Sequence, residues 1–461
     1  MSQPYYIEKQ HFCGDGIALC DGRSIRIANA LKGETVLAED VSVRRRRQAF
    51  LGEVSESSAD RCEPICPHWQ RCPACQYQCL KIECQREIKK NQWLALIKKF
   101  VDIPEDCEIE FNEAPKTLGY RCRTDALVCH GDDGVFLGIL PRLDAAAFSL
   151  IQKGMSTSDL GLLEPGDVLA NEGIEPVPLA HCPLHSDELN ALIDQLEPLI
   201  EDFLPQTRLS LEAYGNSARI VIYAMPEHAH RNREIGQNLA KNLDISVVFQ
   251  ELPPRGSHVY PQPELLGGSP WHCYAHNELG ESLYARTGAW TPVNPDNAQL
   301  IRQSFLRMVH GRHFEHVLEL GCGCGTHSTV FSGVSERYTG IDAAWPAILS
   351  AQYNAKTYKW ENVAFFTDSA DHYLDKRYYR GVRADAIVMH SNRMPYSEKT
   401  SHLCLRFGAK DIFIAAPTAF AIAQECRHFC GLNFHLKKLS LCDTLPLTYH
   451  MMATAHLSLF C

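Results

Sequence analysis

The chain has 461 residues, of which 45% are hydrophobic and 22% are charged. This composition excludes wholesale disorder, a collagen-like repeat and a coiled-coil rod, and at about 150 residues per domain the length predicts two to four folded domains. The net charge of -10 argues against a general attraction to nucleic acid, although it leaves room for a local basic surface. Charge must therefore be read locally along the chain.

The sequence contains no convincing membrane segment. Its longest apolar stretch, residues 411–424, is interrupted by Pro417 and is shorter than the ~18 residues that a spanning helix needs. The first residues lack the basic and apolar regions of a signal peptide, so we expect a cytoplasmic protein without membrane contacts. The 20 cysteines are too dilute for a disulfide scaffold, and in a reducing compartment they indicate ligation of a metal or cluster.

Residues 1–55 combine short strand-like pieces with turns rich in Gly and Asp, a pattern typical of a small β-barrel. Six arginines lie in this segment: Arg23, Arg26, Arg44, Arg45, Arg46 and Arg47. They form either a solvated end of the strands or a surface that follows RNA phosphates. The sequence supports the two interpretations equally.

Residues 56–280 contain a cysteine-rich loop, a helix at about 83–100 with one basic side that includes Lys89, and a mixture of strands and helix. This pattern predicts a central α+β domain. The cysteine loop brings three thiolates within reach of one centre, those of Cys66, Cys72 and Cys75. A fourth ligand could come from Cys62, Cys79, Cys84 or the remote Cys182. The spacing permits a four-cysteine zinc site or a cubane iron–sulfur cluster.

Residues 281–461 alternate strands with helices, which predicts a mostly parallel sheet covered on both faces. Between the first strand and the next helix lies an E-x-G-x-G-x-G turn, made by Glu319, Gly321, Gly323 and Gly325. Glycine allows backbone N–H groups to approach a ligand closely at the carboxyl end of a strand, where doubly wound sheets bind cofactors. The spacing differs from the dinucleotide fingerprint and looks like the S-adenosylmethionine loop of class I methyltransferases.

Two acidic residues follow the next two strands of this sheet. Asp342 ends the second strand, where a carboxylate could hold the ribose hydroxyls of the cofactor, and Asp368 ends the third, near the expected adenine. The glycines would serve only a tight turn if no ligand bound there. The matching strand and acid favour cofactor binding.

Together these motifs resemble the S-adenosylmethionine-dependent RNA uracil-C5 methyltransferases, and more closely the branch with a TRAM domain and a 4Fe-4S cluster that modifies 23S ribosomal RNA. The resemblance rests on G-D-G-I-A and D-G-R-S-I, on the C-P-H-W-x3-C-x2-C loop and a later C-P-L, and on the glycine loop. It covers essentially the whole chain. It implies an OB-like TRAM barrel at 1–55, a central α+β domain with the cluster at 56–280, and a Rossmann-like α/β methyltransferase domain at 281–461.

The same resemblance implies roles for particular side chains. The cluster ligands would be Cys66, Cys72, Cys75 and Cys182, which favours iron–sulfur over zinc. Arg121 and Arg123 would begin the central domain, where basic residues of the family meet RNA. Asn294 matches the asparagine of the family's Q-V-N motif beside the cofactor, although Pro292 replaces the glutamine.

The departures from the family fall on its catalytic motifs. Family members use a cysteine in an S-C-N-P loop to attack C6 of uracil and a glutamate in an H-x-E segment to remove the C5 proton. Here the nucleophile position holds Ala416, or Ala415 when the prolines are aligned, and the base position holds Met452. Alanine cannot form the covalent adduct. The candidate catalytic remnants are Arg393, from the D-P-x-R motif, His390 and His450.

Three functions are compatible with this sequence. The first, which we favour, is a pseudoenzyme that binds structured RNA (ribosomal RNA or tRNA) through the barrel, the basic helix and the cluster domain and serves ribosomal RNA processing. The second is an active RNA methyltransferase of altered mechanism or target atom, with His390 or His450 as base. The third is an iron–sulfur sensor or assembly factor whose output is RNA binding. We expect a monomer in each case.

Overall fold

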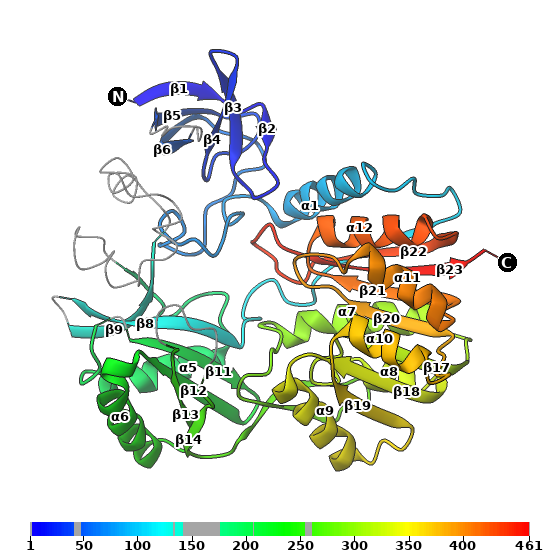
Figure 1. Cartoon of the computed structure of the whole chain (residues 1–461). Helices are drawn as coiled ribbons and strands as arrows, with labels where there is room; N and C mark the ends of the chain where they lie inside the picture. Colours follow the sequence, from blue (N-terminus) through cyan, green and yellow to red (C-terminus); the bar gives the residue numbers. More distant parts are fainter. Residues whose placement is uncertain are drawn as a thin grey trace.

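The computed structural model describes residues 2–40, 48–131, 134–141, 176–205, 207–253 and 261–460. Within these ranges the strands form sheets of six, seven and eight strands and one two-stranded hairpin. Figure 1 shows the six-stranded N-terminal sheet standing above the two larger units. None of the described helices has the length and apolar character needed to cross a bilayer.

The N-terminal sheet has the order β1-β5-β6-β4-β3-β2. Its alternating side chains bury a small apolar core that includes Ile25, Ile27 and Val36. A two-residue turn joins β3 to β4, and both of its residues, Asp21 and Gly22, have positive φ, as a tight hairpin requires. The strands are β1 (Ser2–Tyr6), β2 (Lys9–Gln10), β3 (Gly16–Cys20), β4 (Arg23–Ile27), β5 (Thr35–Asp40) and β6 (Gln48–Glu56).

The central sheet has the order β10-β9-β8-β11-β12-β13-β14. Only β12 and β13 pair in parallel, and α6 provides the crossover between them. The predicted helix near 186–203 is α5, which begins after Ser186, whose side chain caps it. The elements are β8 (Arg123–Gly131), β9 (Gly134–Ile139), β10 (Val177–Pro178), α5 (Asp187–Leu196), β11 (Arg208–Tyr214), β12 (Ser217–Ala224), α6 (Ala229–Asn242), β13 (Ser246–Glu251) and β14 (Glu264–Gly267), with 3₁₀ turns at Glu197–Leu199 and Pro226–His228.

The C-terminal sheet has the order β19-β18-β17-β20-β21-β23-β22-β7. Strands β17 to β21 are parallel, and β23 runs antiparallel to β21. This confirms the predicted α/β sheet. The strands are β17 (Phe314–Leu320), β18 (Ser335–Asp342), β19 (Val363–Thr367), β20 (Ala386–His390), β21 (Asp411–Ala416), β22 (Phe434–Cys442) and β23 (Met452–Leu459).

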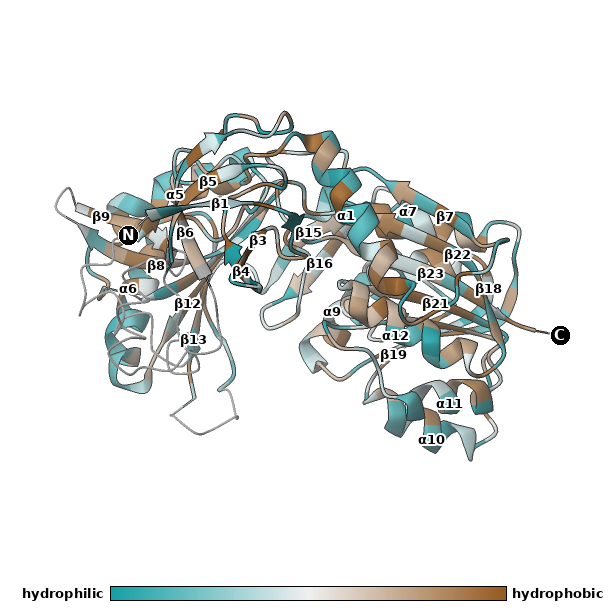
Figure 2. Ribbon diagram, turned by 90° about the horizontal axis from the view of Figure 1, so that it is seen from above, coloured by the Kyte–Doolittle hydropathy of each residue, from teal (hydrophilic) through white to brown (hydrophobic). Residues whose placement is uncertain are grey.

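Helices cover both faces of the C-terminal sheet. One face buries side chains against α7 (Pro295–Val309), α8 (Ser328–Ser332) and α9 (Trp345–Tyr358). The other packs against α10 (Ala370–Tyr378), α11 (Glu398–Phe407) and α12 (Ala419–Cys430). The hairpin of β15 (Trp271–His276) and β16 (Ser282–Arg286) lies against α9, where Asn354 bonds the backbone of Tyr284. In Figure 2 the hydrophobic colours concentrate on the sheet strands.

Two elements from the expected central segment lie on the C-terminal sheet. Strand β7 (Glu108–Asn112) pairs in parallel with β22 and forms an edge of the sheet. Helix α1 (Ile82–Ile97) contributes Trp93 and Ile97 to the same apolar core as α12. The expected domain boundaries at 55 and 280 stay predictions, but these contacts join residues 82–112 to the methyltransferase-like unit.

A buried ion pair fixes α1 to the segment between β22 and β23. The Nζ of Lys89 donates to Oδ1 of Asp443 and, at 3.2 Å, to the carbonyl of Leu445. Both charged side chains are 1% exposed. Burial lowers the pKa of Lys89, and the carboxylate of Asp443 opposes that shift. The basic side of this helix was predicted to face RNA, but Lys89 faces the interior instead, because it neutralises a buried carboxylate.

Candidate cofactor and RNA site

The glycine loop follows β17 at the carboxyl edge of the parallel strands. Gly321, Gly323 and Gly325 all have positive φ, between +55° and +80°, a region that other residues adopt only with strain. A Cβ on Gly321 would lie 3.0 Å from the carbonyl of His390, and one on Gly325 would lie 3.1 Å from Oγ of Ser328. The outer glycines are therefore required by close packing.

The middle glycine differs from its neighbours. A Cβ on Gly323 would meet no protein atom within 4 Å, so this residue borders open space. Its N–H donates to Oδ2 of Asp342 at 3.0 Å. Packing therefore does not explain glycine at this position, but its positive φ does, and the open space beside it would let a ligand approach the backbone.

The two predicted acids lie side by side above the loop. The N–H of Asp368 donates to the carbonyl of Asp342 at 3.1 Å, and both carboxylates are partly exposed. Asp342 also accepts from the backbone of Ala344, while Asp368 contacts Nδ1 of His372 at 2.7 Å. These residues suit the adenosine part of a cofactor. The carboxylates of Asp342 and Asp368 can accept hydrogen bonds from free ribose hydroxyls, and Asp342 contacts Gly323, which borders open space.

Glu319 is fully buried at the end of β17 and contacts His390 and Tyr338. The hydroxyl of Tyr338 donates to Oε2. Nε2 of His390 lies 2.7 Å from Oε1, but the two atoms are not aligned for a hydrogen bond. The ring of His327 stacks on His390 with centroids 4.8 Å apart, and its burial lowers its pKa well below the ordinary value. A histidine at position 390 thus accommodates the buried glutamate, which a second carboxylate would repel.

The expected nucleophile and base positions lie together in the structure. Ala415 and Ala416 end β21 and are 1% and 0% exposed. Ala416 pairs with Ala453, the residue that follows Met452 at the start of β23. The fold therefore brings the two altered positions close to each other, as it must if they once shared a reaction centre.

Other thiols of this unit are badly placed to substitute for the missing nucleophile. Cys404, Cys426 and Cys442 are each 0% exposed, and burial raises the pKa of Cys442 to about 12. Burial also raises the pKa of Cys404 and Cys426. Such thiols stay protonated and inaccessible at neutral pH.

The candidate remnants have different surroundings. Arg393 is exposed after β20. Burial, followed by the charge of Arg393, lowers the pKa of His450 to about 4. A base of that pKa accepts protons weakly near neutral pH. His450 is therefore a poor candidate base at that pH.

The four predicted cluster ligands come from two distant segments that lie close together. Burial, together with the neighbouring thiols of Cys72, Cys182 and Cys66, raises the pKa of Cys75 to about 12. The N–H of Gly119 donates to Pro183 and that of Arg121 to Leu184, which holds the 182 segment in place. However, no three Cys, His, Asp or Glu side chains converge as metal ligands anywhere in the described residues.

The remaining predicted residues are partly engaged by protein groups. The amide of Asn294 is buried and donates to the carbonyl of Thr444. Arg26 contacts Asp15 at 2.5 Å and Sγ of Cys13 at 2.6 Å. Arg23 is exposed, Arg121 and Arg123 are half-buried, and Arg123 lies 3.4 Å from the carbonyl of Thr291. Four predicted arginines, Arg44, Arg45, Arg46 and Arg47, lie outside the described residues.

One buried carboxylate, that of Glu425 on α12, was not among the predicted site residues. Its Oε1 accepts from Oγ of Ser391 and from the N–H of Tyr396, both at 2.6 Å. The hydroxyl of Tyr396 would lie 3.0 Å from a Cβ on Gly321. Glu425 therefore orders the loop that joins β20 to the cofactor edge. A single acid within the apolar stretch A-F-A-I-A-Q-E-C was the available signal.

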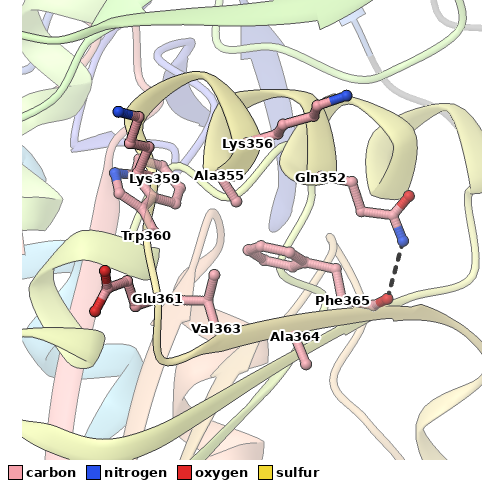
Figure 3. Close-up of a pocket in the computed structure, with 9 residues that line it drawn as sticks. All are labelled: Gln352, Ala355, Lys356, Lys359, Trp360, Glu361, Val363, Ala364 and Phe365. Atoms are coloured by element: carbon pink, nitrogen blue, oxygen red, sulfur yellow. Dashed lines mark hydrogen bonds between the residues drawn. The ribbon is translucent and has the colours of Figure 1, made fainter.

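A surface groove of about 340 Å³ lies elsewhere, between the end of α9 and the start of β19 (Figure 3). Trp360, Val363 and Phe365 line it, and Gln352 bonds the carbonyl of Phe365 at 3.2 Å. The groove opens at the amino end of β19, whereas the glycine loop lies at the carboxyl edge of the sheet. It is therefore separate from the candidate cofactor site.

No family model matches the chain. Curated relatives nonetheless align over nearly its whole length. An uncharacterized RNA methyltransferase of Listeria monocytogenes is 22% identical over 465 aligned residues, covering 97% of this chain and 95% of the relative. The 23S rRNA (uracil(1939)-C(5))-methyltransferase RlmD of Shewanella halifaxensis is 22% identical, covering 96% of this chain and 92% of that enzyme.

A solved structure matches this fold over almost the whole chain. The tRNA (uracil-54, C5)-methyltransferase of Pyrococcus abyssi, in complex with S-adenosyl-L-homocysteine, superposes with a TM-score of 0.69 at 16% identity, covering 99% of this chain and 100% of that one. The chain thus has a methyltransferase fold. It is a relative of the RNA methyltransferases, including the uracil-C5 enzymes, as the motifs predicted.

The open space at Gly323 generates a first prediction. Gly323→Val should abolish binding of S-adenosylmethionine, which we expect at micromolar affinity in the parent protein, because the side chain fills the space for the ligand. Isothermal titration calorimetry measures this directly. Gly215→Val is the matched control, since Gly215 has φ +56° and also borders open space. Equal loss of binding in both variants would indicate backbone strain and contradict the assignment.

The carboxyl of Glu425 generates a second prediction. Burial raises its pKa from the ordinary 4.5 to about 7, so the folded state binds the proton more tightly and this stabilisation is lost as pH rises through 7. Urea unfolding should show Glu425→Gln gaining stability over the parent between pH 5 and pH 8, by at most about 3 kcal/mol. Glu361→Gln, on the surface, should leave the profile unchanged. A constant difference between parent and Glu425→Gln would refute the shift.

Proposed function

We propose that this protein binds structured RNA, S-adenosylmethionine and a 4Fe-4S cluster, and that it does not carry out C5 methylation of uracil by the covalent route. The proposal rests on a contrast between two sets of residues at the same edge of the C-terminal sheet. The glycine loop and its acids are intact, while Ala416 (or Ala415) and Met452 occupy the reacting positions beside them.

The chemistry explains why these changes matter. C5 of uracil is a weak nucleophile until another group adds to C6, and the product is released only after a base removes the C5 proton. The methyl group of alanine cannot add to C6, and a methionine thioether does not accept protons at neutral pH. Bound S-adenosylmethionine would supply an electrophilic methyl group, but the residues at these two positions provide neither a nucleophile for C6 nor a base for the C5 proton.

RNA recognition in this proposal uses the N-terminal sheet as a TRAM-type module. Arg23 and the run Arg44–Arg47 would contact phosphates, with Arg121 and Arg123 on the central unit. Arg26 contributes less, because Asp15 already neutralises it. The names of the relatives support an RNA partner, ribosomal RNA in one case and tRNA in another.

A cluster at Cys66, Cys72, Cys75 and Cys182 is supported by the chemistry of the donor set. The thiols of Cys66, Cys72 and Cys182 lie near enough to Cys75 to influence its pKa, and burial raises the pKa of Cys75 and of Cys182. A bound cubane would crosslink the 66–75 loop to the 182 segment. The alternative function, an iron–sulfur sensor or assembly factor, also requires this cluster.

A second candidate function is methyl transfer to a nitrogen or oxygen, which needs no covalent activation. One observation favours it: His390 packs against Gly321 and contacts the buried Glu319 at 2.7 Å. His390 would be the base in this case.

Incubation with cofactor and ribosomal RNA tests the main proposal. Nucleoside mass spectrometry should detect no 5-methyluridine formed by the purified protein, because neither the nucleophile nor the base is present. Ala416→Cys should not restore turnover, since Met452 still supplies no base. Formation of 5-methyluridine by the parent protein would overturn the proposal. A different methylated nucleoside that disappears in His390→Ala would establish the second candidate in its place.

Anaerobic purification tests the cluster. We expect about four iron and four sulfide per chain, with Cys182→Ser losing the cluster as fully as Cys72→Ser. Cys84→Ser is the matched control, because Cys84 lies nearby but comes from α1. Stoichiometric zinc without sulfide, or equal loss in Cys84→Ser, would contradict the ligand set.

A further inference from the structure

A compact set of cations lies at the end of α10, far along the chain from the predicted RNA-binding residues. The segment 376–383 reads K-R-Y-Y-R-G-V-R, with four cations and no acid, in a chain whose net charge is -10. Arg406, at the end of α11, joins them. We call this set the α10 patch: Lys376, Arg377, Tyr379, Arg380, Arg383 and Arg406.

Aromatic rings orient the guanidinium groups of the patch. Tyr378 is the main platform: the guanidinium carbon of Arg383 lies 4.1 Å from its ring centroid, and that of Arg406 lies 4.7 Å away. Arg377 covers the rings of Phe366 and Tyr373 at 5.3 and 5.2 Å. Such cation–π contacts hold the arginines in place. Nη1 of Arg383 also donates to the carbonyls of Tyr378 and Val382, which leaves its other guanidinium nitrogens to bind an anion.

A solvent-exposed tyrosine, Tyr379, lies beside these cations. Tyr379 is 78% exposed, and its ring lies edge-on to Tyr378 at 5.7 Å. Arg406 interacts with its hydroxyl, an interaction that raises the pKa of the arginine. The large apolar side chains exposed at the patch are aromatic, Tyr379 within it and Phe366 beside it under Arg377, which suits stacking on a base better than burial in a bilayer.

Helix stability explains only part of this arrangement. Lys376 and Arg377 lie in the last turn of α10, where cations favour the helix dipole. Arg380, Arg383 and Arg406 lie outside that turn, and the dipole gives no reason for an exposed tyrosine among them. The nearby acids are engaged elsewhere: Asp375 contacts Lys399 at 3.7 Å, and Asp385 accepts from the backbone of His316.

The patch lies on the opposite edge of the sheet from the glycine loop. Helix α10 begins after the carboxyl end of β19 and runs back along the sheet, so its final turn reaches the amino edge of the parallel strands. Figure 2 shows α10 and α11 together on the outside of the C-terminal unit. A ligand that contacted both the patch and the cofactor edge would therefore have to extend across the C-terminal unit.

We propose that the α10 patch is a second RNA-contact surface, in which arginines bind phosphates and Tyr379 stacks on an unpaired base. This inference rests on the proposed RNA binding and adds a surface that the glycine loop, the barrel and the cysteine segments do not include. Cations beside an exposed aromatic ring are the combination that single-stranded RNA requires, because phosphates and base faces alternate along it.

Fluorescence anisotropy titrations of the full chain test the surface, with one RNA hairpin that carries a single-stranded tail and one that lacks it. Tyr379→Ala should weaken binding of the tailed RNA about tenfold and leave the tailless RNA unaffected, while Tyr379→Phe should bind both normally. Lys376→Gln combined with Arg380→Gln should lower the slope of log affinity against log salt by about 1.5. Lys241→Gln, on the exposed face of α6, is the control.

The outcomes separate this surface from the proposed function. If the parent protein binds the tailed RNA and the patch variants bind equally well, the patch is not an RNA surface and the proposed RNA binding stands. If the parent protein binds neither RNA, the proposed function itself fails. Polyglutamate that competes as well as RNA, or variants that lose binding to anionic phosphatidylglycerol vesicles but not to RNA, would overturn the patch in favour of an acidic protein or a membrane.

Discussion

The buried pair of Lys89 and Asp443 fixes the segment on which the rest of the arrangement depends. Removing one partner of such a pair typically costs about 3–5 kcal/mol, because the other charge is left buried and unpaired. The segment after Asp443 is hydrogen-bonded to several parts of the chain: Thr444 to Asn294 just before α7, Leu447 to Tyr77 after the cysteine loop and to Gln85 of α1, and Pro446 to Tyr120. It then leads directly to Met452 and the former base position. The cysteine loop, the central unit and the reacting edge are therefore coupled through one loop.

This coupling helps to explain which positions match the methyltransferase motifs and which positions depart from them. The packing positions of the glycine loop are retained, since Gly321 and Gly325 tolerate no side chain, and Gly323 keeps an open approach that packing does not demand. The reacting positions carry small or apolar side chains that fit the core without strain. His390 places an imidazole beside the buried carboxylate of Glu319. Under the proposed function, the fold retains a cofactor-binding edge without the covalent chemistry of uracil-C5 methylation.

Local patterns made much of this predictable from the sequence. The alternation of strands and helices after residue 281 predicts the parallel sheet, and the spacing of glycines and acids predicts the edge where a cofactor would bind. Nonlocal pairing was not predictable: β7 joins β22 across more than 300 residues, and no periodicity in residues 108–112 indicates that partner. The basic side of α1 and one arginine of the barrel, Arg26, were misleading for a related reason. Sequence shows the charge of Lys89 and Arg26 but not the carboxylates, Asp443 and Asp15, that neutralise them.

The central claim is that RNA and cofactor meet an edge that has no nucleophile, and covalent trapping tests it most directly. RNA that carries 5-fluorouridine stalls uracil-C5 methyltransferases after the nucleophile has added and the methyl group has been transferred, because fluorine cannot leave as the C5 proton does. Denaturing gel electrophoresis of the protein, S-adenosylmethionine and this RNA should show no species that migrates as a covalent complex, while a native gel of the same mixture shows bound RNA. A stable adduct on the denaturing gel would prove that another residue attacks C6 and would contradict the account.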